Sequence, residues 1–328
     1  MNIPVQKKYI FFMTALVFLW MIPFTLAGGE LFCRICHGRI SGRYFTVNKK
    51  PCCSRNCAEE MRRRLLPECY ACRRSMERFV KITSHNEERS YCLSCNGRPK
   101  CFHCKFPERS LIRLPDGRRL CRICSHSAVT DRGQAAELFS RTRRNMGRFL
   151  GIETPCRISF SLADTRKIAS LHKEGGTKEW GLYVCRKRTK MQIVRSTRTG
   201  KIIRRQPLPA EKQCFIYILS HLTRDTFSQT AAHELTHDYM EEHFPCIKDP
   251  LWCEGAAEYA AFLYNIVTKN SGRNRTIEKN QDPVYGGGFR MIASRIPSHL
   301  SPRQKAEHLI KLLAGKNREE MRKQTIRR

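Results

Sequence analysis

The chain has 328 residues, 41% of them hydrophobic, so it can bury the core of one ordinary domain and carry a smaller region besides. This composition excludes a wholly disordered chain. With 61 Lys and Arg against 29 Asp and Glu, the net charge is +32, which excludes an acidic protein and favours contact with anionic surfaces or polymers.

The first 28 residues have the order of a targeting segment. Lys7 and Lys8 precede an apolar run from Tyr9 to Ala27, as in a secretory signal peptide. The run of nineteen residues is also just long enough to cross a bilayer. The sequence therefore predicts an exported or membrane-anchored protein, with residues 1–28 as signal peptide or anchor. Arginines just beyond the run leave a cytoplasm-facing orientation open as the alternative.

Residues 30–128 form a cysteine-rich region with the spacing of zinc fingers. Of the 18 cysteines, 13 fall here, most of them as Cys-x-x-Cys pairs. Two pairs separated by about 15 to 20 residues can supply four thiolates to one tetrahedral zinc. Two modules follow this rule, and a third is looser because either Cys52 or Cys53 can complete it. The predicted ligand sets are Cys69, Cys72, Cys92 and Cys95; Cys101, Cys104, Cys121 and Cys124; and Cys33, Cys36, Cys53 and Cys57.

A disulfide framework is the alternative for these cysteines. Zinc is favoured because disulfide frameworks do not need repeated pairs at these separations. The two or three zinc ions would be structural, since four thiolates close the coordination shell. We expect the region to fold on metal and to dock a substrate or protein partner, or to regulate the rest of the chain.

Residues 130–328 show the periodicity of a globular α+β domain. Helices and strands are expected in mixed order, with the main elements as helices over 134–150 and 164–173, strands over 181–194 and 213–220, and helices over 225–242 and 250–268. By fold analogy, the strand 213–220 is expected at a sheet edge, where extended substrate can pair with it.

A strongly basic run lies within this domain. From Arg186 to Arg205 there are nine Lys or Arg and no acidic residue. Apolar residues alternate with the basic ones, which predicts a twisted hairpin with solvated basic edges. The rival hypothesis is a surface for nucleic acid, anionic lipid or another anionic polymer. Nucleic acid ranks behind a protein substrate, because no RNA-recognition signature accompanies the run.

The segment His233-Glu234-Leu235-Thr236-His237 falls on the predicted helix 225–242. Residues four apart share one helix face, so both histidines can bind one metal while Glu234 reaches a water beside it. This spacing predicts a catalytic zinc, with Glu234 as the general base in peptide-bond hydrolysis.

Two further glutamates follow on the next helix. Glu254 lies near its start and can complete a site of two histidines and one glutamate. Glu258 is one turn further on and can accept the free ring N–H of a ligand histidine. The alternatives are a solvated charge for Glu258 and a structural histidine pair that holds no metal.

A donor to the developing oxyanion is also expected. Four downstream residues qualify: Tyr259, Tyr264, Tyr285 and His299. We select Tyr285 as the second catalytic residue, because the run Tyr285-Gly286-Gly287-Gly288 has the composition of a mobile loop that could close over substrate. A plain surface turn is the alternative.

This combination resembles a known peptidase family. LIM-type zinc fingers followed by one HExxH domain are similar to the plant ubiquitin-activated peptidases that restrict organ size, the "DA-one" family, and their bacterial relatives. The resemblance rests on residues 181–184 (Gly-Leu-Tyr-Val), on 232–237 and on Glu254-Gly255. Residues 252–259 are also similar to the glutamate-ligand helix of gluzincin peptidases.

The resemblance implies His233 and His237 as zinc ligands, Glu234 as the base and Glu254 as the third ligand. Unlike a standard LIM domain, the chain has five residues (96–100) between its zinc modules, and no acidic ubiquitin-interacting helix precedes them. The predicted fold class is therefore α+β, with a zincin-like (gluzincin) metallopeptidase domain behind small four-cysteine, LIM-like modules. The alternatives are a zinc-finger protein that binds nucleic acid or another polyanion, and a catalytically inactive adaptor.

Overall fold

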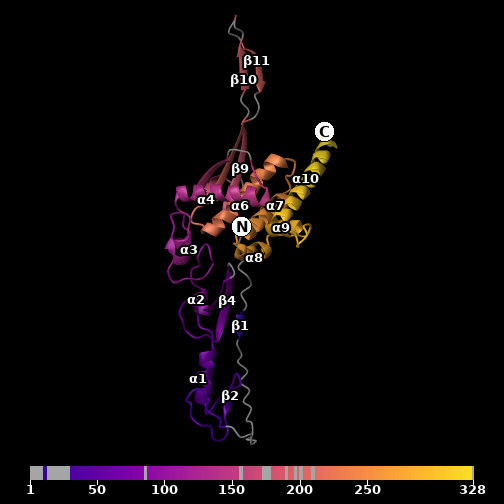
Figure 1. Ribbon diagram of the computed structural model, residues 1–328. Coiled ribbons are helices and arrows are strands. Elements are labelled where there is room, and N and C mark those ends of the chain that lie inside the picture. Colours follow the sequence, from indigo (N-terminus) through magenta and orange to yellow (C-terminus); the bar gives the residue numbers. More distant parts are fainter. Residues whose placement is uncertain are drawn as a thin grey trace. The chain divides into compact units, whose positions relative to one another are not determined.

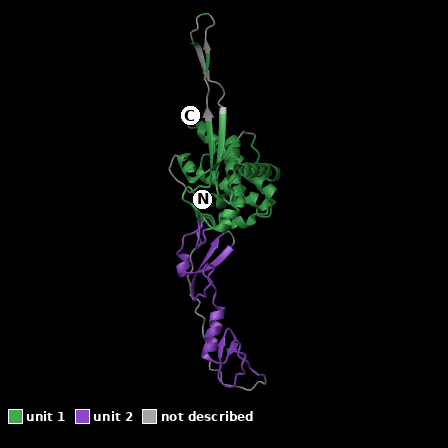
Figure 2. Ribbon diagram, turned by 90° about the vertical axis from the view of Figure 1, so that its left-hand side faces the viewer, with its two compact units in different colours: residues 1–4, 102–104, 112–328 green, residues 5–101, 105–111 purple. Residues whose placement is uncertain are grey.

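The computed structural model describes residues 10–12, 30–84, 87–154, 158–171, 179–188, 191–195, 198, 202–207 and 211–326 (Figure 1). The chain divides into two compact units (Figure 2), with unit 1 comprising Met1–Pro4, Phe102–Cys104 and Ile112–Arg328 and unit 2 comprising Val5–Cys101 and Lys105–Leu111. The division falls inside the predicted cysteine-rich region 30–128, so the last part of that region belongs to unit 1.

Unit 2 consists of small hairpins and short helices. Their bounds are β2 (Phe45–Val47), β3 (Lys50–Cys52), α1 (Arg55–Leu65), β4 (Arg78–Ser84), β5 (Glu87–Cys92) and α2 (Leu93–Asn96). The strands pair antiparallel as β2–β3 and β4–β5. Helix α1 begins at Ser54, whose hydroxyl accepts a hydrogen bond from the Cys57 N–H at 3.2 Å.

A stacked arginine helps to hold unit 2 together. The guanidinium carbon of Arg89 lies 4.0 Å from the ring centroid of Tyr70 and 4.2 Å from that of Phe106. Its Nε and Nη2 donate to the Glu87 carboxylate at 2.6 and 3.0 Å. Because only 7% of the Arg89 side chain is exposed, the cation–π contacts and the two-pronged ion pair act with little screening by water.

The predicted membrane anchor is wrong. Among the residues that the structure describes, no helix is both long and apolar enough to cross a bilayer. Within the predicted segment, β1 (Ile10–Phe12) is a strand that pairs antiparallel with β4, with Phe11 opposite Phe79. β-Branched and aromatic residues favour an extended backbone, and an apolar run alone does not distinguish a strand from a helix. The remainder of the predicted targeting segment lies outside the described residues.

The sheet of unit 1 has three strands in the order β8 (Ile158–Ala163), β12 (Glu211–Leu219), β9 (Gly181–Arg188). Strand β12 pairs parallel with β8 and antiparallel with β9. The predicted edge position of strand 213–220 is therefore wrong, because β12 is central and its backbone is paired on both sides. Strands β8 and β9 are the two edges of this sheet.

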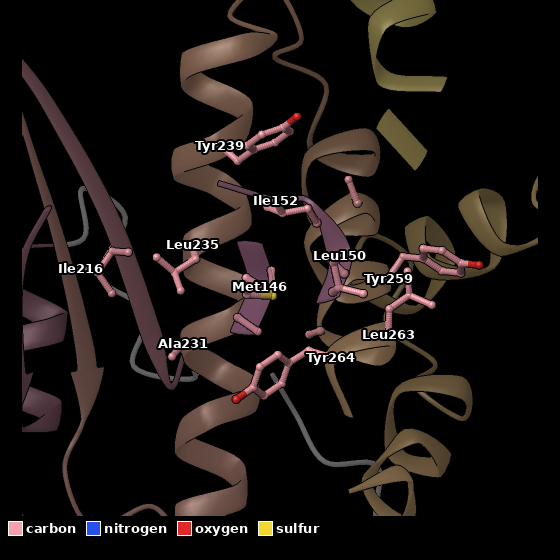
Figure 3. Packing of buried hydrophobic residues seen from close by; sticks show 14 of the residues in the cluster. Met146, Leu150, Ile152, Ile216, Ala231, Leu235, Tyr239, Tyr259, Leu263 and Tyr264 are labelled. Atoms are coloured by element: carbon pink, nitrogen blue, oxygen red, sulfur yellow. The ribbon is translucent and has the colours of Figure 1, made fainter. Parts of the chain in front are cut away.

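Helices make up most of the rest of the described part of unit 1. They are α3 (Arg122–His126), α4 (Arg132–Asn145), α5 (Thr165–Leu171), α6 (Arg224–His243), α7 (Pro250–Val267), α8 (Asn274–Glu278), α9 (Tyr285–Ala293) and α10 (Pro302–Ile326), with η1 (Met146–Leu150) as a π-helical turn and η2 (Ser271–Arg273) as a 3₁₀ turn. In Figure 3, Leu235 of α6 points toward Ile216 of β12, while Met146 and Leu263 lie on the opposite side of that helix. These side chains belong to one buried cluster, so α6 is held on both sides.

The basic run forms the predicted hairpin. Strand β10 (Met191–Arg195) pairs antiparallel with β11 (Ile202–Pro207), with Gln192 opposite Gln206. Most of its side chains lie outside the described ones, so binding of a polyanion to the hairpin stays a prediction.

The glycine run after Tyr285 is a helix, contrary to the predicted loop or turn. It forms the start of α9, and Gly286 and Gly288 are buried. A Cβ added to Gly255 of α7 would lie 2.5 Å from the carbonyl carbon of Gly288. These glycines are therefore needed for two helix backbones to pack against each other, a role that the sequence pattern alone does not reveal.

Candidate metal centres

Helix α6 brings the two histidines of the HExxH segment together. The Nε2 atoms of His233 and His237 are 3.1 Å apart. The Oε2 atom of Glu254 lies 3.1 Å from the first of these nitrogens and 3.4 Å from the second. Zinc–nitrogen and zinc–oxygen bonds of about 2.05 Å in a tetrahedral shell place neighbouring ligand atoms about 3.3 Å apart. The three residues therefore fit one zinc ion, which leaves a fourth position for substrate or water.

The position of Glu254 depends on how helix α7 begins. The Asp249 side chain accepts a hydrogen bond from the Leu251 N–H at 2.9 Å, and Pro250 occupies the first turn. Gly255 is in contact with the backbone of Gly288 in α9. The start of α7 is thus fixed by its cap and by close helix packing, which set the position of the Glu254 carboxylate.

Glu234 lies in a pocket beside the ligand atoms, with its residue surface only 5% exposed. Burial raises the pKa of its carboxyl to about 8, against the opposing charge of His237. A Cβ on Gly181, at the start of β9, would lie 2.7 Å from the Glu234 Cγ. The pocket is lined by Glu179, Trp180, Gly181, Thr230, His233, Glu234 and Tyr285.

Glu258 lies behind the ligand His233. Its carboxylate oxygen is 3.6 Å from the Nδ1 atom of His233, the nitrogen that faces away from the ligand cluster. Glu258 is fully buried, and burial together with the charge of Glu254 raises the pKa of Glu258 to about 8. Within the described part of the chain, neither the Glu258 oxygens nor this ring nitrogen have a hydrogen-bond partner, so the two groups are positioned for each other.

The four predicted oxyanion donors are in different places. Tyr285 lines the pocket, with its ring centroid 6.1 Å from that of His233. Burial raises the pKa of Tyr285 well above its usual range, so its phenol stays protonated and can donate. Tyr259 is buried in the core, the Tyr264 hydroxyl donates to Thr142 at 3.3 Å, and His299 is exposed. Of the four, only Tyr285 lines this pocket.

The cysteines gather in three clusters of four. Their ligand atoms lie within 4.8 Å of one another in the sets Cys33, Cys36, Cys53 and Cys57; Cys69, Cys72, Cys92 and Cys95; and Cys101, Cys104, Cys121 and Cys124. The first set contains Cys53, whereas Cys52 is outside it, which distinguishes between the two residues that spacing left open.

The sulfur separations fit zinc and not disulfides. Four Sγ–Sγ distances within the clusters are 3.5, 3.7, 4.0 and 3.8 Å. Tetrahedral zinc with bonds of about 2.3 Å places sulfurs about 3.8 Å apart, whereas a disulfide needs about 2.05 Å. No disulfide joins cysteines among the described residues. Each of the three clusters can therefore hold a metal ion such as zinc.

Each cluster begins with the same backbone turn. The residue after the first Cys-x-x-Cys pair has a left-handed φ of 59° at His37, 61° at Arg73 and 60° at Lys105. Its N–H donates to the carbonyl of the first cysteine at 2.9, 2.8 and 3.0 Å, respectively. A left-handed backbone conformation costs energy at a residue other than glycine. Its recurrence in all three clusters indicates that the turn is shaped to present two thiolates.

Some residues of the pocket were not predicted from the sequence as parts of a site. Trp180 and Thr230 carry no motif, and Gly181 was noted only as part of a family segment. A glycine that opens a strand is a weak signal of close backbone approach, and here it marks the contact with Glu234. No family model matches the chain, and neither a curated protein nor a solved structure is significantly similar to it. The resemblance to the DA-one family therefore stays a prediction.

Proposed function

We propose that the protein is a zinc metallopeptidase that hydrolyses peptide bonds of a protein substrate. The observation that carries this proposal is the convergence of ligand atoms from His233, His237 and Glu254 beside the buried carboxyl of Glu234. A structural zinc site would have four protein ligands, whereas this one has three and opens onto a pocket.

Zinc held by these ligands would supply Lewis acidity, which makes a water nucleophilic near neutral pH and polarises the scissile carbonyl. Glu234 accepts the proton of the attacking water and passes it to the leaving amine, a role worth about 10²–10⁴-fold in rate. Tyr285 donates a hydrogen bond to the carbonyl oxygen as negative charge develops there. Glu258 holds the ring of His233 in one tautomer and orientation.

Strand β9 supports an extended peptide as the substrate. It lies at the edge of the three-stranded sheet, and its first residue, Gly181, lines the pocket with Glu234. An edge strand offers backbone N–H and C=O groups to an added strand, which binds a peptide largely independently of its sequence. Strand β9 therefore takes the peptide-pairing role that the sequence predicted for strand 213–220.

The test compares wild type with Glu234→Gln on a denatured protein substrate, with zinc content measured on the same samples. The substitution keeps the shape of the side chain and removes the base, so activity falls by about 10²–10⁴-fold while zinc is retained. The matched control is Glu241→Gln on the same helix. Glu241 pairs with Lys248 on the outer side of the helix, so this variant is expected to keep full activity. Equal activity in wild type and Glu234→Gln refutes the proposal. Inactivity of wild type on every substrate tried favours the adaptor or polyanion-binding alternative.

A further inference from the structure

Three of the four cysteines of the last cluster belong to the same compact unit as the HExxH helix, and the fourth, Cys101, belongs to unit 2. Cys104, Cys121 and Cys124 all lie in unit 1, whereas the first two clusters lie entirely in unit 2. The segments that carry these three cysteines are therefore candidates for a role inside the catalytic unit.

His103 connects this cluster to the start of α6. Its Nδ1 atom lies 3.7 Å from the Cys124 sulfur. On the other side of the ring, Nε2 is 2.6 Å from the Thr226 hydroxyl and 3.1 Å from that of Thr223. The two hydroxyls are themselves 2.8 Å apart, and both His103 and Thr226 are buried. A continuous polar chain thus runs from a cluster sulfur to the first turn of α6, which carries the proposed base two turns later.

The same imidazole supports a wall of the active-site pocket. The rings of His103 and Trp180 are stacked, with centroids 6.0 Å apart and planes inclined by 22°. Trp180 lines the pocket, and the next residue, Gly181, is in contact with Glu234. A shift of His103 would therefore be passed through Trp180 to the backbone against which Glu234 packs.

The loop between the two cysteine pairs of this cluster is also anchored. Arg118, which is 8% exposed, donates to the Ser220 carbonyl at 2.8 Å, directly after β12. The Leu222 carbonyl accepts a hydrogen bond from the Val129 N–H at 2.8 Å. The connection from β12 to α6 is thus tied to residues on both sides of α3.

We infer that the third cysteine cluster is an internal support of the peptidase site, with His103 as a positioning residue, so that metal loss from this cluster switches the site off. Metal loss from the first two clusters leaves the site intact. This inference rests on the proposed function for its catalytic consequence, whereas its structural part is independent of that function.

The test uses the full chain with two matched pairs of variants. Cys121→Ser and Cys92→Ser each remove the first thiolate of the second pair, in the third and the second cluster respectively. His103→Ala is compared with His126→Ala, an exposed histidine on α3. Hydrogen–deuterium exchange by mass spectrometry is measured over residues 179–184 and 223–230, together with zinc content and peptidase activity.

In Cys121→Ser and His103→Ala, exchange over both segments is expected to be at least about tenfold faster than in wild type, and activity to fall by at least about tenfold. Exchange over both segments in Cys92→Ser and His126→Ala is expected to stay within about twofold of wild type. Unchanged exchange in Cys121→Ser and His103→Ala, or equal acceleration in Cys92→Ser, overturns the inference. Should wild type lack peptidase activity, the exchange data still decide whether the cluster supports these segments, so failure of the two proposals can be told apart.

Discussion

Replacement of Gly181 by alanine places one methyl group against the proposed base. The added Cβ would lie 2.7 Å from the Glu234 Cγ and 2.7 Å from the Thr230 Cγ2, both on α6. The Glu234 Oε1 would be closer still. An ordinary contact starts at 3.4 Å, so the two surfaces must separate by at least about 0.7 Å. The backbone of Gly181 does not have a positive φ, so alanine introduces no backbone strain and the effect is steric alone.

The size of the effect follows from this separation. Overpacking of a closely packed site costs about 1–3 kcal/mol of stability. Displacement of a catalytic group by about 1 Å costs about 10²-fold in rate. We therefore expect kcat/KM to fall by about 30- to 100-fold, with the zinc content unchanged, because Gly181 contacts the base and not the ligands.

Steady-state kinetics on a fluorogenic peptide and urea unfolding measure the two effects. Gly315→Ala in α10 is the control, since a Cβ there meets no atom within 4 Å. Alanine in an open helix position stabilises the protein by about 0.5–1 kcal/mol and leaves activity unchanged. A Gly181→Ala enzyme with wild-type kcat/KM would refute the placement of Glu234 as the base.

Three further outcomes are expected. Tyr285→Phe removes only the hydroxyl, so kcat is expected to fall by about 10²–10³-fold with zinc content unchanged, and wild-type kcat would identify another donor. Glu258→Gln replaces the carboxyl group next to the outer ring nitrogen of His233 with an amide, and zinc affinity at this site, measured by chelator competition, is expected to fall by about 10- to 100-fold. Equal affinity would exclude this role. Arg89→Lys loses both ring contacts and the two-pronged ion pair with Glu87. The free energy of unfolding of unit 2, measured by chemical denaturation, is therefore expected to fall by about 2 kcal/mol. An unchanged free energy of unfolding would show that the stacking contributes little.

Patterns set by neighbouring residues could be predicted from the sequence. The i, i+4 spacing of His233 and His237 fixes a shared helix face, and the structure places their nitrogens 3.1 Å apart. The Cys-x-x-Cys pairs likewise gather as their separations predicted. The shared face of the two histidines depends on one helical turn, and each Cys-x-x-Cys pair depends on one tight turn. The sequence determines such turns locally.

Arrangements set by distant residues could not be predicted. The run at Gly286 has the composition of a loop, and only the facing Gly255 of another helix makes it a packed helix start. Strand β12 is central because β8, about fifty residues earlier, pairs with its other side, and no local pattern specifies that partner. The apolar N-terminal run likewise gave no signal that Ile10–Phe12 would pair as a strand with β4.

The most direct test of the central claim is a zinc count on wild type, His237→Ala and Glu234→Gln, by native mass spectrometry and elemental analysis of the full chain. Three cysteine clusters and the site at His233, His237 and Glu254 predict four zinc ions in wild type and in Glu234→Gln. Loss of one ligand predicts three in His237→Ala, with the cluster zincs retained. An identical zinc count in wild type and His237→Ala would contradict a metal centre on α6 and, with it, the proposed peptidase.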